Sequence, residues 1–158
     1  MAKRRPSTLR LGSVSHGTMR PEDLIPPFLW ECSRIRLSHA ERDTVRGIAR
    51  EFHTFPDDFD IDAVNAAWRE QMDDALTSLF DILNAHCPDF CTFGAQEGDG
   101  SDYGVWVSWD ALDDGDVFKG EREHAAKSDR YTLEVNDHGN ATLYRRAGNR
   151  WVECWSAV

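Results

Sequence analysis

Residues 61–95 read IDAVNAAWREQMDDALTSLFDILNAHCPDFCTFGA, and the spacing of their apolar residues changes at Pro88. Before Pro88 the apolar residues recur every three or four positions, which predicts an amphipathic helix over about residues 60–86, capped by Asp60 or Asp62. After Pro88 they alternate, which predicts strands. We therefore expect an α+β protein, with helices before this point and a sheet after it.

The two faces of this predicted helix differ in chemistry. The apolar face consists of Ile61, Val64, Trp68, Met72, Ala75, Leu76, Leu79 and Leu83. Of these, we expect Trp68, Leu76, Leu79 and Leu83 to face the sheet. The opposite face carries Glu70, Asp73, Asp74 and Asp81. We expect these four acidic side chains to form a solvated stripe.

Two further helices are predicted before it, so that there are about three in all. Residues 18–37 have helical spacing, but Pro26 and Pro27 are expected to break or restart that helix. The sequence Ser38-His-Ala-Glu41 is a capping box, which predicts that another helix starts there and runs to about Phe52.

Four or five strands are predicted after Pro88, arranged as one antiparallel meander packed with the helices around one core. Asn136-Asp-His-Gly-Asn140 is a hairpin signal, with Gly139 placed for a positive φ. Residues 110–120 are expected to form an acidic loop. The predicted strands cover residues 90–95, 103–109, 131–135, 141–145 and 151–158.

The length of 158 residues fits a single domain, which we expect to cover residues 18–158. Residues 1–17 form a basic arm, for which a flexible tail and an edge strand are equal alternatives. No apolar run has the length of a secretion signal or a membrane span, so we expect a cytoplasmic protein. The four cysteines are too few and scattered for a disulfide scaffold and are interpreted as reduced, packed thiols.

Acidic residues are concentrated in one block. Residues 57–121 carry 17 acidic and two basic side chains, a net charge of −15, whereas the whole chain has −10 and its first 20 residues have +5. A block of this density repels nucleic acid and anionic membranes, and it attracts cations or a basic protein surface. We therefore expect a basic protein partner and neither nucleic acid nor a membrane.

Two acidic segments are candidate cation sites. Residues 110–121 match positions 1, 5, 6 and 12 of an EF-hand loop, but Leu112 occupies position 3, where a ligand is required. A solvated turn is therefore the favoured interpretation. Asp99 and Asp102 in the Gly-rich turn are a weaker candidate for the same chemistry.

The segment His86-Cys87-Pro-Asp-Phe-Cys91 has a spacing that zinc permits, with Cys154 or a distant His as a fourth ligand. The favoured interpretation is that His86 and Pro88 simply end a helix. The adjacent Ser15 and His16 do not by themselves indicate catalysis, and no phosphate-binding or hydrolase motif is present. We expect no catalytic residues, no metal and no cofactor.

Four tryptophans fall on predicted strands and are expected in the core: Trp106, Trp109, Trp151 and Trp155. A single tryptophan left exposed beside the acidic block would instead be an interface anchor.

Three segments together resemble a family of small acidic proteins carried by bacteriophages and related mobile elements. They are residues 15–26 (SHGTMRPEDLIP), 93–106 (FGAQEGDGSDYGVW) and 135–144 (VNDHGNATLY). The resemblance implies an accessory protein that acts in the cytoplasm of a bacterial host, and it carries no activity or site residues with it. Many such proteins block host defences, some of them by imitating DNA.

These observations predict a non-enzymatic accessory protein whose acidic patch binds a basic host protein. The most specific version of this prediction is that the protein is a DNA mimic that inhibits a CRISPR- or restriction-type complex. The predicted partner-binding residues are Glu70, Asp73, Asp74, Asp81, Asp99, Asp102, Asp110, Asp113, Asp114 and Asp116. The alternative is a calcium- or magnesium-binding module, or a metal-dependent enzyme, that uses the loops in residues 97–121. A third interpretation is that the acids only keep the protein soluble.

Overall fold

The computed structural model describes residues 5–52 and 66–158, with side chains described from Arg69 onward in the second range. Its helices are α1 (Pro21–Arg34), α2 (His39–Phe52), α3 (Ala66–Ala85) and α4 (Trp109–Asp114). The strands are β1 (Gly12–Ser15), β2 (Cys91–Gln96), β3 (Asp99–Val107), β4 (Val117–Lys119), β5 (Tyr131–Val135), β6 (Ala141–Ala147) and β7 (Arg150–Ala157).

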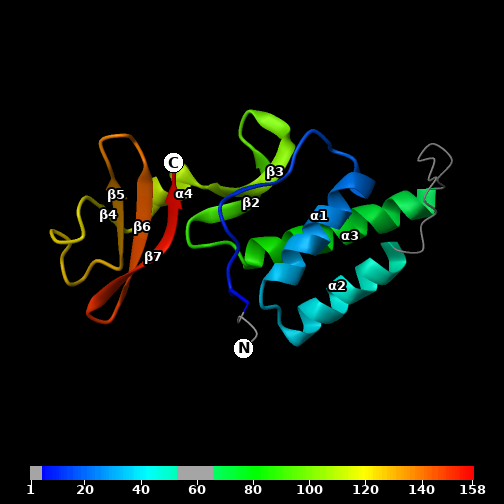
Figure 1. The fold of residues 1–158 in the computed structure, drawn as a ribbon, viewed down its shortest axis with the longest axis horizontal. Coiled ribbons are helices and arrows are strands. Elements are labelled where there is room, and N and C mark those ends of the chain that lie inside the picture. Colours follow the sequence, from blue (N-terminus) through cyan, green and yellow to red (C-terminus); the bar gives the residue numbers. More distant parts are fainter. Residues whose placement is uncertain (1–4, 53–65) are drawn as a thin grey trace.

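The strands form two sheets, in the orders β1-β3-β2 and β4-β5-β6-β7. Figure 1 shows the three long helices at one end of the molecule, the four-stranded sheet at the other, and the small sheet with α4 between them. No helix among the described residues combines the length and the apolar character that crossing a membrane requires.

The α+β class is confirmed, but two expectations about its arrangement were wrong. The helices are not all N-terminal, because residues expected to end a strand and open an acidic loop form α4. The sheet is not one meander, because there are two sheets and β4 runs parallel to β5. The connection over residues 120–130 allows this pairing, since it returns the chain to the same end of the sheet before β5 starts.

Helix α1 continues through Pro26 and Pro27, where a break was predicted. Both prolines remove a backbone donor, yet the helix buries a full apolar face: Leu24, Ile25, Phe28 and Cys32. Packing of that face outweighs the local cost of the prolines.

The predicted capping box of α2 is confirmed. The Ser38 amide donates to Glu41 Oε2 at 2.6 Å, and the Glu41 amide donates to Ser38 Oγ at 3.3 Å. These reciprocal bonds satisfy two amides that a helix start otherwise leaves without partners. Hydrogen bonding of the Glu41 carboxylate by the Ser38 side chain, and then by the Ser38 amide, lowers the pKa of Glu41.

Within the described residues, the apolar face of α3 is turned inward and its acidic face is exposed, as predicted, but the apolar face packs on α1 and α2 as well as on the small sheet. Met72, Leu79 and Leu83 are buried, and Leu76 is half-buried. The expected cap at Asp60 or Asp62, and the side chains of Ile61, Val64 and Trp68, lie outside the described part of the chain.

The buried residues form two clusters rather than the single core that was expected. The first lies between α1, α2, α3 and the small sheet, with Phe28, Leu79, Leu83, Phe93 and Val105 at its centre. The second lies between α4 and the four-stranded sheet, and its buried members are Leu112, Leu133, Ala141, Leu143 and Trp155. Leu11 and Cys91 pack against both clusters, so residues near the small sheet join the two.

The described part of the basic arm packs against the helices before it enters β1. The Leu9 amide donates to the His86 carbonyl at 2.8 Å, and the Arg36 amide donates to the Pro6 carbonyl at 2.8 Å. Strand β1 then pairs antiparallel with β3, where Ser13 lies opposite Gly104.

Candidate protein-binding groove

The predicted partner-binding residues are exposed, apart from Asp102, which is half-buried. Four of them lie on α3 and are called the α3 stripe: Glu70, Asp73, Asp74 and Asp81. Four lie on α4 and the turn after it and are called the α4 cluster: Asp110, Asp113, Asp114 and Asp116. The remaining two, Asp99 and Asp102, lie on β3.

The α3 stripe and the α4 cluster do not form one surface. Figure 1 shows α3 extending from the small sheet toward one end of the long axis, while α4 lies on the opposite side of that sheet, next to β7. The acidic block is therefore continuous in sequence and divided in space.

Asp99 and Asp102 are engaged within the fold. Asp99 Oδ1 accepts hydrogen bonds from the amide and the hydroxyl of Ser101, at 3.0 and 2.8 Å, and these bonds lower the pKa of Asp99. Asp102 Oδ1 accepts a hydrogen bond from Ser13 Oγ at 2.5 Å, which ties β1 to β3. The Asp99 carboxylate thus binds within β3, and the Asp102 carboxylate links β3 to β1.

Of the other eight acids, Asp113 alone forms an ion pair with another described residue. Asp113 accepts a hydrogen bond from Lys119 Nζ at 2.6 Å and forms an ion pair with it. Among the described residues, no ion pair involves the rest of the α4 cluster or any member of the α3 stripe. The α4 cluster with Lys119 therefore has a net charge of −3, from four acids and one base.

Helix α4 is positioned by Phe90, the one described residue other than glycine with a positive φ, at 61°. The Phe90 carbonyl accepts a hydrogen bond from the Ser108 amide at 2.9 Å, immediately before the helix. The Phe90 ring packs edge-on against Tyr131 at 5.1 Å and lies so close to Gly115 that a Cβ there would meet it at 2.8 Å. Gly115 thus lets the helix end directly over the Phe90 ring.

Trp109 is the first residue of α4 and remains 52 % exposed. Its ring packs edge-on against Trp155 at 6.5 Å, and Trp155 is itself buried and donates from Nε1 to the Asp89 carbonyl at 2.8 Å. The expectation that Trp109 belongs to the core was wrong, because the chain leaves β3 after Val107 and turns into a helix. Trp155 is in the core, as expected.

A groove of about 530 Å³ lies beside Trp109. Strand β3 supplies Val105, Trp106 and Val107 to its walls, and Glu97 lies in the turn between β2 and β3. Leu11, just before β1, and the end of β7 also border it. The side chain of Trp106 on β3 donates a hydrogen bond from Nε1 to the carbonyl of Gly94 on the neighbouring strand β2, at 2.9 Å. This bond fixes the position of the Trp106 ring. Its volume lies within the range of small-molecule pockets, about 300–1,000 Å³, so it has room for a side chain of a partner.

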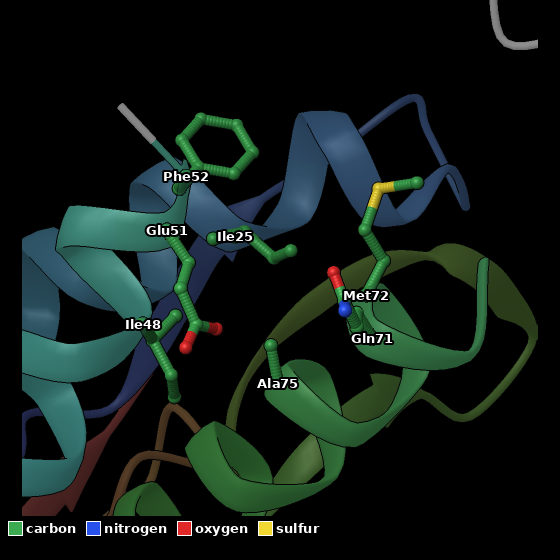
Figure 2. Close-up of a pocket in the computed structure, with 7 residues that line it drawn as sticks. All are labelled: Ile25, Ile48, Glu51, Phe52, Gln71, Met72 and Ala75. Atoms are coloured by element: carbon green, nitrogen blue, oxygen red, sulfur yellow. The ribbon is translucent and has the colours of Figure 1, made fainter. Parts of the chain in front are cut away.

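A second cavity, between α1, α2 and α3, is much smaller. Figure 2 shows that the side chains around it come from all three helices, and apolar Ile25, Ile48, Met72 and Ala75 are among them. Its volume of about 20 Å³ holds roughly one water molecule and no metabolite. It is a packing gap in the helical cluster.

The cysteines near the two cores have no activated thiol. Burial raises the pKa of Cys91 to about 12, and burial followed by the charge of Asp89 raises the pKa of Cys154 to about 11. Thiolates, which act as nucleophiles and metal ligands, are therefore scarce at neutral pH.

The zinc and calcium interpretations find no geometric support. Both ring nitrogens of His86 already have partners, the Ser7 carbonyl at 2.8 Å and Glu41 Oε1 at 3.1 Å. Residues 110–114 form a helix instead of a loop that could wrap an ion. Within residues 5–52 and 66–158, no three His, Cys, Asp or Glu side chains are arranged to hold a metal ion.

The chain matches no protein-family model, no curated protein sequence and no solved structure. The assignment of the groove therefore rests on its own chemistry. The sequence predicted partner-binding acids in the segment that forms α4 but did not predict the groove, whose lining comes from β1, β2, β3, β7, α4 and the residues next to them. The sequence-based expectation that pointed toward this groove was that a tryptophan exposed beside acidic residues would anchor an interface.

Proposed function

We propose that this protein is a non-enzymatic accessory protein of a bacteriophage or mobile element that binds a basic surface of a host protein. The observation that carries the proposal is the exposed ring of Trp109, which begins the helix that carries Asp110, Asp113 and Asp114. A large apolar ring supplies binding energy, and the surrounding charge selects a basic partner and speeds encounter with it.

The charge spacing bears on the DNA-mimic form of the proposal. The α3 stripe spans residues 70–81, about 16 Å of helix at 1.5 Å per residue. Duplex DNA of that length carries roughly ten phosphates, and one of its strands carries roughly five. Four carboxylates thus resemble a single row of phosphates. This favours a partner that presents one basic segment over a groove that encloses a whole duplex.

Two quadruple charge reversals test the proposal. One replaces the four acids of the α3 stripe with Lys, and the other replaces the four acids of the α4 cluster with Lys. Each variant and the wild type are used to capture proteins from a bacterial lysate at low and at high salt. Because all eight positions are exposed, both variants should melt cooperatively near the wild-type temperature.

The wild type should retain a basic protein at low salt and release it at high salt, since exposed charges are screened. The α4 reversal should lose that protein. If both reversal variants retain it as well as the wild type does, the acids serve solubility alone and the proposal is wrong.

A further inference from the structure

The groove beside Trp109 combines two indole rings with negative charge. Trp106 and Trp109 both line it, and Glu97 is the one ionisable side chain among the described residues on its walls. Along α4, Trp109 is followed directly by Asp110, the first acid of the α4 cluster. Within the described lining no lysine or arginine is present to supply a cation from the protein itself.

This combination favours a cationic side chain over an apolar one. The face of an indole ring carries negative charge, and it attracts a guanidinium or ammonium group placed over it. The flanking carboxylates oppose anionic and favour cationic ligands. Arginine suits the groove better than lysine, because its planar group stacks on a ring, is weakly hydrated and can still donate to a carboxylate.

We propose that the groove between the small sheet and α4 seats an arginine side chain of an extended basic segment of a partner protein. The guanidinium stacks on Trp106 and Trp109 and donates to Glu97, and neighbouring basic residues of the segment contact the α4 cluster. This inference rests on the proposed function and names the site and the residue type through which it acts.

The test uses the full chain and synthetic peptides. The first peptide alternates arginine with serine, and in two matched peptides every arginine is replaced by lysine or by glutamine. Binding is measured by fluorescence anisotropy of labelled peptide. The indole N–H resonance of Trp109, assigned with a Trp109→Phe variant, reports whether the peptide reaches the groove.

Two variants probe the site and one controls for exposed tryptophan. Trp109→Ala and Glu97→Gln change the groove, whereas Trp30→Ala removes a tryptophan on α1 that is 64 % exposed and outside it. The arginine peptide should bind the wild type and shift the Trp109 resonance. Trp109→Ala should weaken it on the order of tenfold. Glu97→Gln should weaken it less, and Trp30→Ala should leave it unchanged.

The peptides separate the chemistry of the occupant. The lysine peptide should bind more weakly than the arginine peptide, and the glutamine peptide should not bind. Equal binding of the glutamine peptide would show an apolar site and overturn the inference. Equal binding of the arginine peptide by the wild type and by Trp109→Ala would also overturn it.

Failure of the inference can be told apart from failure of the proposed function. If reversal of the α3 stripe abolishes peptide binding while Trp109→Ala does not, the protein binds basic segments elsewhere, and only the groove assignment falls. If the wild type binds no arginine peptide and captures no basic protein, both proposals fall.

Discussion

A methyl group added at Gly104 should disrupt the small sheet. In β3, Gly104 lies between Gly94 of β2 and Ser13 of β1. A Cβ at this position would overlap the carbonyl oxygen of Gly12 and lie 2.9 Å from both the carbonyl carbon of Gly12 and the Cα of Ser13. All three atoms belong to the backbone, so no side chain can rotate away, and β1 must shift or separate from β3.

The cost of Gly104→Ala should reach the upper end of the overpacking range, about 3 kcal/mol. For a chain of this size that corresponds to a fall of roughly 6–12 °C in Tm. The measurement is thermal and denaturant unfolding followed by circular dichroism. Hydrogen exchange should also accelerate at the amides of β1 before it does in α3, because β1 is the strand displaced.

The matched control is Gly94→Ala, which changes the cross-strand partner of Gly104 in the same sheet. A Cβ at Gly94 meets nothing within 4 Å, so its effect should stay within about 0.5 kcal/mol. The close approach of β1 to β3 would be refuted if Gly104→Ala cost less than about 0.5 kcal/mol, or if both variants cost the same.

Three further predictions concern stability and reactivity. Leu79→Ala should lower the free energy of unfolding by about 2–5 kcal/mol, because Leu79 is fully buried in the helical cluster, and a change near zero would place that helix face outside the core. Ser38→Ala should cost about 1 kcal/mol in urea unfolding at neutral pH. Because folding lowers the pKa of Glu41, the ionised Glu41 side chain should stabilise the folded protein at neutral pH, and this stabilisation should disappear as the pH falls below 4.5. A loss of stability in Glu41→Gln that persists in acid would contradict this. Native Cys32, which is buried, and Cys91, which is half-buried, have pKa values of about 12 and should react with a disulfide reagent at mildly alkaline pH far more slowly than the same thiols in denaturant; equal rates would show that the fold does not suppress their ionisation.

The parts of the fold that sequence predicted well are those in which one local pattern dominates. The capping box at Ser38 specifies the start of α2 through bonds between residues three positions apart. The hairpin at residues 136–140 forms with Gly139 at a φ of 83°, as its turn chemistry requires. Buried Met72, Leu79 and Leu83 follow the 3.6-residue period of α3.

The parts that sequence did not predict depend on contacts between distant segments. Helix α4 is short, and it forms where the Phe90 carbonyl and ring meet Ser108 and Gly115, a contact that no local period reveals. The parallel pairing of β4 with β5 likewise depends on the path of the connection between them. Continuity of α1 through two prolines reflects packing of its buried face, which outweighs local propensity.

For the candidate site as well, the sequence predicted the features that depend on neighbouring residues and missed those that depend on residues far apart in the chain. The charge of Asp110, Asp113, Asp114 and Asp116 and the exposure of the α3 stripe were predictable from composition and period. The groove was not, because its walls are brought together from residues far apart in the chain, such as Leu11 and Trp106. The positions of the acidic residues in the sequence therefore did not show which of them lie near an exposed tryptophan that could anchor a partner.

The two exposed tryptophans, Trp30 and Trp109, have different surroundings. Trp30 on α1 is more exposed than Trp109, but its neighbour Glu31 forms an ion pair with Arg34 at 2.8 Å, which neutralises the charge beside it. Trp109 stands beside a cluster that keeps a net negative charge after its one ion pair with Lys119 is counted. Trp109 also borders a groove, whereas the described lining of neither cavity includes Trp30. Because a partner needs apolar contact and matching charge at the same place, Trp109 and α4 are where the acidic block can select what it binds.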